Sequence, residues 1–72
     1  MSGFLVTALL DAIRTSLRVN IGEVQYETPQ GERLWQVSAV NNPGERWIAA
    51  APDDYQAALL LAELVGFDVM DG

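Results

Sequence analysis

Neighbouring carboxylates are the first feature of this sequence that could do chemistry. Asp53 and Asp54 stand side by side, and two such groups can share a proton or bind a cation. Pro52 precedes them and an apolar stretch follows, which is the pattern of a helix start. Acidic side chains there stabilise the positive end of the helix dipole. We therefore predict a structural role for this pair.

Three further candidates lie at other positions. Glu23 and Glu27 share the polar side of an alternating stretch and could hold one divalent ion, and Tyr55 could donate a proton. Trp35 and Trp47 could stack on nucleic-acid bases, but the sequence offers no basic groove beside them. We expect the tyrosine to pack with its hydroxyl at the surface, and the tryptophans to pack on aliphatic neighbours or a protein partner.

The residue types that most often carry catalysis are missing. The 72 residues include no cysteine and no histidine, which excludes disulfides, thiolate nucleophiles and zinc–sulfur sites. The sequence also lacks a glycine loop that could cradle phosphate. We predict a protein that is not an enzyme and has no cofactor, no metal and no evident small-molecule ligand.

The net charge is −6, and the chain has ten acids and four basic residues, all arginine. The bases end at Arg46, so the remainder of the chain is purely acidic. Such a region repels phosphate backbones and anionic membranes, so we expect no direct nucleic-acid binding and no membrane binding. The acids can simply give solubility, or they can form a surface for a basic partner. The candidates for that acidic partner surface are Asp53, Asp54, Glu63 and Asp68.

We expect no signal peptide in the N-terminal stretch, because it lacks a basic beginning and its arginines follow the apolar part. No apolar run approaches the roughly 20 residues that a membrane helix needs. We expect a cytoplasmic protein with one domain over residues 1–72, in which about 67–72 form a tail.

Periodicity predicts two helices around three strands. Helical spacing covers 3–18 and 52–65, and strand patterns cover 20–28, 33–40 and 46–51. The stretches TPQGE and NNPGE, each with a proline before a glycine, predict the hairpin turns between the strands. The fold class is therefore α+β, α-β-β-β-α, with a three-stranded antiparallel meander and both helices on one face. We expect Asn20 to close the first helix and Gly66 the second.

The predicted sheet has two apolar faces. If Thr28 lies opposite Glu32 across the first turn, Tyr26 lies opposite Leu34, and the alternation separates the strand residues into two sets. One face carries Val24, Tyr26, Leu34, Val40, Ile48 and Ala50, and the other carries Trp35, Val37, Ala39, Trp47 and Ala49. Because two helices cover only one face, we expect the tryptophan-bearing face to stay open.

The second helix is apolar around most of its circumference. One side carries Leu61 and Val65, and a second side carries Ala57, Leu60 and Leu64. The first side can pack on the sheet, whereas the second must meet the other helix, a partner or water. Contiguous exposed apolar patches of several hundred Å² usually mark interaction sites. Alternatively, the first helix and the tail, with Phe67 or Val69, cover that side.

Two resemblances follow from these patterns. The element order resembles the double-stranded RNA-binding domain, but APDDYQ stands where that family has its lysine cluster, so RNA binding is not carried over. The stretch RWIAAAPDDYQAALLLAEL resembles the strand-then-helix ending of small uncharacterised phage and bacterial proteins, including the phage ABA-sandwich type. That likeness covers 46–64 and implies a phage or mobile-element origin, with no activity and no site residues.

We predict a small acidic protein-interaction module that forms a homodimer or binds a protein partner. The second helix or the tryptophan-bearing face would form the contact, because symmetric association buries surplus apolar surface. The alternative is a phage- or mobile-element-encoded acidic inhibitor of the anti-defence type, which occupies the nucleic-acid-binding site of a host enzyme. The candidate protein-interaction residues are Trp35, Trp47, Leu60 and Leu64.

Overall fold

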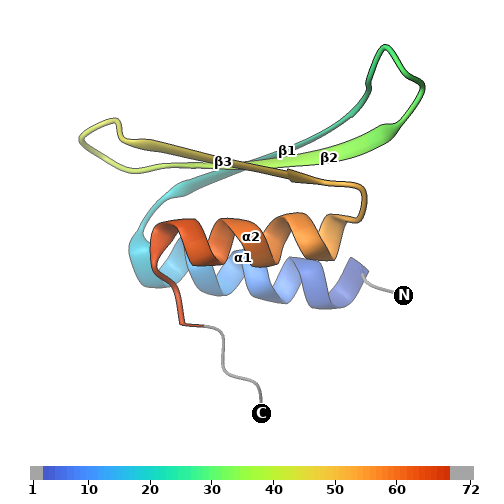
Figure 1. Ribbon diagram of the computed structural model, residues 1–72. Helices are drawn as coiled ribbons and strands as arrows, with labels where there is room; N and C mark the ends of the chain where they lie inside the picture. Colours follow the sequence, from blue (N-terminus) through green and yellow to red (C-terminus); the bar gives the residue numbers. More distant parts are fainter. Residues whose placement is uncertain (1–2, 69–72) are drawn as a thin grey trace.

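The computed structural model describes residues 3–68 and confirms the α-β-β-β-α order (Figure 1). The helices are α1 (Gly3–Leu17) and α2 (Asp54–Val65). The strands are β1 (Asn20–Glu27), β2 (Arg33–Val40) and β3 (Arg46–Ala51), and they form an antiparallel sheet in the order β1-β2-β3. Both helices lie on one face of this sheet, so the chain has two layers.

The predicted register is confirmed, because Tyr26 pairs with Leu34 and Val24 pairs with Gln36. The first turn sets this register: the N–H of Gly31 donates to the carbonyl of Thr28 at 2.8 Å. Gly31 has a φ of 88°, a left-handed conformation that glycine adopts without steric cost. The turn therefore closes as the Pro-Gly pattern predicts.

In the second turn, the side chain of Asn41 adds to the backbone hydrogen bonds between Asn41 and both Gly44 and Glu45. Its Oδ1 accepts from the N–H of Gly44 at 3.2 Å and from that of Glu45 at 2.8 Å. Its Nδ2 donates to Oε1 of Glu45 at 2.8 Å. Asparagine side chains commonly support turns in this way, and here one residue holds the hairpin between β2 and β3 closed.

The ends of α2 follow the sequence signals. Asp53 is the N-cap, and its Oδ2 accepts from the N–H groups of Tyr55 at 3.1 Å and Gln56 at 3.2 Å. The structural role predicted for this aspartate is therefore confirmed, although Pro52 lies before the cap and outside the first helical turn. Gly66 closes the helix in the left-handed conformation, as expected.

The end of α1 differs from the prediction. Arg18 takes the left-handed conformation, with a φ of 56°, and Asn20 already belongs to β1. The physical reason lies in Val19, which is buried and lies two residues after Leu17, the last residue of the helix. The chain must turn sharply at Arg18 to bring this side chain into the core.

The core lies between the sheet and the helices and consists mostly of small side chains. Leu61, Ile13 and Val37 are the largest fully buried residues. Phe67 packs against the same core, as predicted, while Val69 lies outside the described residues. The buried set is Val6, Leu10, Ile13, Val19, Val37, Ala39, Ala49, Ala51, Ala57, Ala58, Leu61 and Ala62, half of it alanine.

Substitution of two neighbouring leucines on α2, one buried and one exposed, tests which side chains form the core. Leu61 is 0% exposed and Leu60 is 45% exposed. We expect Leu61→Ala to lower the free energy of unfolding by about 3 kcal/mol, because truncation of a buried leucine leaves a cavity. Leu60→Ala should cost less than about 1 kcal/mol. Urea denaturation of both variants measures the difference, and equal losses would contradict this description of the core.

Candidate interaction site

The tryptophans lie on the covered face of the sheet. Trp35 and Trp47 are half-buried and pack against the core beneath the helices, so the prediction that their face stays open is wrong. The register explains the result, because Trp35 lies opposite Ala51, and Trp47 lies opposite Ala39. Each large ring stands beside a small side chain, so the helices can approach the centre of this face while the rings fill its flanks.

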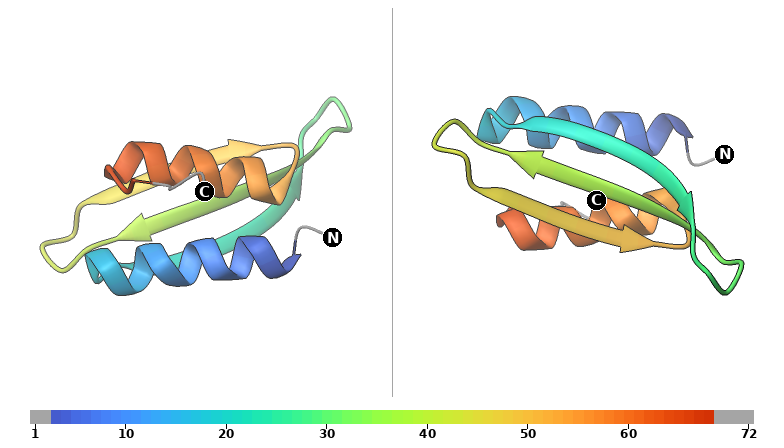
Figure 2. Two further views of the ribbon diagram at one scale, coloured as in Figure 1. Left: turned by 90° about the horizontal axis from the view of Figure 1, so that it is seen from below. Right: turned by 90° about the horizontal axis from the view of Figure 1, so that it is seen from above.

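The opposite face is open, and we call it the open face. It carries the predicted set with Val24, Tyr26 and Ile48, together with the polar Gln36 and Ser38 in β2. No helix covers these positions in the part of the chain that is described (Figure 2). Val24 is 55% exposed, Ile48 49% and Tyr26 39%, so apolar side chains from both outer strands reach solvent.

Among residues 3–68, no strand residue on the open face is acidic. Arg46, opposite Val40 at one corner, is its only charged strand residue. The acidic strand residues Glu23 and Glu27 alternate onto the helix-facing side of β1. In a chain with a net charge of −6, this distribution leaves a surface on which two copies can meet without bringing carboxylates together.

The second candidate surface is the outer side of α2. Leu60 and Leu64 are one turn apart, and Leu64 is 54% exposed. Ala57, which the sequence groups with these leucines, is fully buried in the core. The helical layer therefore covers part of this side and leaves a narrow strip of two leucines.

The candidate acidic partner surface is not contiguous. Asp53 uses its carboxylate to cap α2, and Asp54 follows in the first turn, where it also has an interaction partner. Glu63 and Asp68 lie at the other end of the helix, whose 12 residues span about 18 Å. The acids thus stand at both ends of α2.

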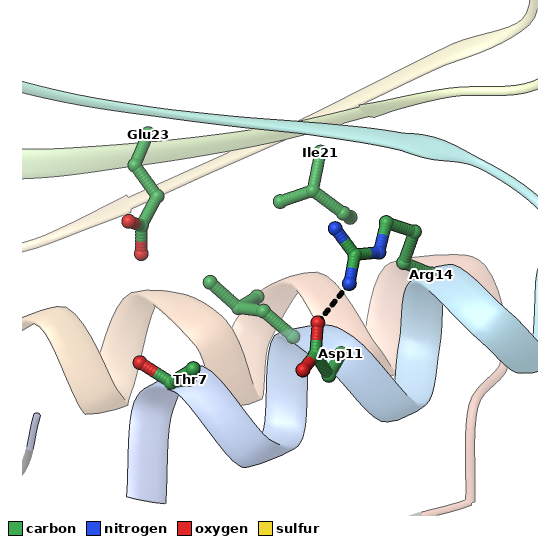
Figure 3. Close-up of a pocket in the computed structure, with 6 residues that line it drawn as sticks. Thr7, Asp11, Arg14, Ile21 and Glu23 are labelled. Atoms are coloured by element: carbon green, nitrogen blue, oxygen red, sulfur yellow. Dashed lines mark hydrogen bonds and ion pairs between the residues drawn. The ribbon is translucent and has the colours of Figure 1, made fainter. Parts of the chain in front are cut away.

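The structure shows a polar groove between α1 and β1 that the sequence did not predict (Figure 3). It encloses about 210 Å³, and Arg14 donates from Nη2 to Oδ1 of Asp11 on its helical side. Glu23 extends from β1 on the other side. The groove is lined by Thr7, Leu10, Asp11, Arg14, Ile21 and Glu23. In the sequence, the helical spacing of Thr7, Asp11 and Arg14 indicates that these three residues share one side of the helix, which is the side that lines the groove.

Other chemical candidates find no support among residues 3–68. This part of the chain contains no group of three or more acidic ligands that could hold a metal ion. Tyr55 is half-buried and packs against the core. Among the described helices, none is long and apolar enough to cross a membrane.

The chain matches no protein-family model, and no curated protein or solved structure shows significant similarity to it. The likeness to the double-stranded RNA-binding domain and that to phage proteins therefore stay predictions.

Adjacent residues on opposite faces of β3 test the assignment of the sheet faces. We expect Trp47→Ala to lower the free energy of unfolding by about 2 kcal/mol, because the ring packs against the core. Ile48→Ala should change it by less than about 1 kcal/mol, since this side chain is half exposed. Urea denaturation measures both values. A larger effect at Ile48 would mean that the helices cover the other face.

Proposed function

We propose that this chain is a non-enzymatic protein-interaction module that self-associates through the open face. The observation that carries the proposal is an exposed apolar sheet face without acids on an otherwise acidic chain. Val24, Tyr26 and Ile48 supply the apolar contact. Gln36 and Ser38 supply hydrogen-bonding groups that a second copy can satisfy.

The dimensions of the face indicate a weak dimer. β1 and β2, with eight residues each, are about 26 Å long, and β3, with six, is about 20 Å long. At a spacing of about 4.8 Å per strand, the face has a flat area of about 350 Å². A standard interface buries about 800 Å² on each partner, so we expect a micromolar dissociation constant.

Two open faces can pack as the sheets of a β-sandwich do, about 10 Å apart. Such packing would bury the exposed parts of Ile48 and Val24 against the open face of the second copy. Each of these side chains contributes on the order of 1 kcal/mol when it leaves water.

The alternative function, an acidic inhibitor at a nucleic-acid site, has less support. A mimic of nucleic acid needs carboxylates on one continuous surface. Here Asp53 and Asp54 are separated from Glu63 and Asp68 by the length of α2.

Sedimentation equilibrium tests self-association. At about 100 μM, well above a micromolar dissociation constant, the wild-type mass should approach twice 7.9 kDa. Ile48→Glu should give a monomer, because it places a charge within the apolar contact. Leu60→Glu is the matched control, since Leu60 is 45% exposed and Ile48 49%, and it should leave the dimer intact.

Two results would contradict the proposal. The first is a wild-type monomer at the same concentration. The second is a dimer that Leu60→Glu dissociates and Ile48→Glu leaves intact, since this would move the contact to α2. Circular dichroism of each variant confirms that the fold is retained before the masses are compared.

A further inference from the structure

The outer edge of β1 carries backbone groups without a partner strand in the described part of the chain. The N–H of Thr28 donates to the carbonyl of Glu32, so this pair points inward toward β2. In an antiparallel ladder the direction alternates, and the backbone groups of Glu23, Gln25 and Glu27 therefore point outward. All residues from Gly22 to Glu27 are exposed, so this edge is accessible.

The polar groove lies beside this edge. α1 runs along β1 and lies beneath and beyond it (Figure 2). Glu23 faces the groove from β1, while Arg14 is engaged by Asp11 on the helix (Figure 3). Within residues 3–68 the carboxylate of Glu23 makes no ion pair. An extended segment that adds to β1 would therefore place its helix-side residues next to an unpaired acid.

We propose that the β1 edge and its groove bind an extended segment of a partner protein by strand addition. Main-chain hydrogen bonds would supply affinity, and alternate side chains would supply specificity. Residues opposite Glu23 and Glu27 lie on the helix side and should be basic. Residues opposite Val24 and Tyr26 lie on the open-face side and should be apolar. The recognised pattern is basic, apolar, any residue, apolar, basic.

Charge favours a partner protein over a second copy at this edge. Antiparallel pairing of two β1 strands about Gln25 would bring Glu23 of each copy opposite Glu27 of the other. Like charges directly opposite one another destabilise a strand pair. A basic segment meets the same carboxylates with opposite charge.

The test uses a labelled synthetic peptide with the core Lys-Val-Thr-Val-Lys and fluorescence anisotropy with the full chain. We expect a dissociation constant below about 1 mM at low salt. Glu23→Lys should weaken binding about tenfold or more, because it reverses a charge in the groove. Glu63→Lys makes the same change on the exposed last turn of α2 and should leave binding unchanged.

A second pair of probes tests the backbone contact with wild-type protein. The threonine of the peptide lies opposite Gln25, so its N–H points at β1, whereas the N–H groups of the valines point away. N-methylation of the threonine should weaken binding about tenfold, and N-methylation of a valine should not. These probes keep the test independent of variants that fail to fold.

Several outcomes would overturn the inference. They are the absence of binding up to about 1 mM peptide, equal weakening by both charge reversals, and equal binding of both methylated peptides. These outcomes do not decide whether the chain forms a dimer, which is tested separately. Because Ile48 lies on β3, away from the groove, Ile48→Glu should abolish self-association and leave peptide binding unchanged.

Discussion

The packing of α2 against the sheet is the contact on which the rest of the structure depends. It places Leu61 and a row of alanines against the small residues of β2 and β3, so backbone layers approach closely. Small domains bury a limited fraction of their surface and have little stability to spare. A core with so many alanines gains little from each residue, so its few large members, Leu61 and Ile13, carry a large share of the stability.

One helical layer also determines which surfaces remain for other molecules. Two helices cover one face of a three-stranded sheet, and the other face keeps Val24, Tyr26 and Ile48 in contact with water. The same layer leaves β1 thinly covered, because α1 lies partly beyond it. The open face and the β1 edge are thus two consequences of one arrangement, and they differ in charge. The face lacks acids, whereas the groove beside the edge holds Asp11 and Glu23.

This difference in charge separates the two proposed contacts. An acid-free apolar face suits a second copy of an acidic chain, while an acidic groove beside a free strand edge suits a basic segment. Strand addition at β1 leaves Ile48 on β3 accessible, whereas Val24 and Tyr26 would lie beside the added segment. The proposals therefore describe a module that combines self-association with capture of a partner.

Local sequence signals determined the elements, their order and their register. Alternation in the strands, the glycines of the two turns, Asp53 as N-cap and Gly66 as C-cap all act within a few residues of the chain. Such short-range preferences can be recognised without the fold. The two sets of residues on the faces of the sheet followed from the same register.

Tertiary structure alone decided which face the helices cover. Both faces are apolar, so alternation could not choose between them, and the choice depends on how alanines and tryptophans fit the helical surface. Packing also decided that Arg18 turns the chain so that Val19 enters the core. The groove is lined by Asp11 from α1 and Glu23 from β1, and no local sequence pattern indicates that these two residues lie near each other. These features depend on shape complementarity between distant segments, which hydrophobicity and spacing do not describe.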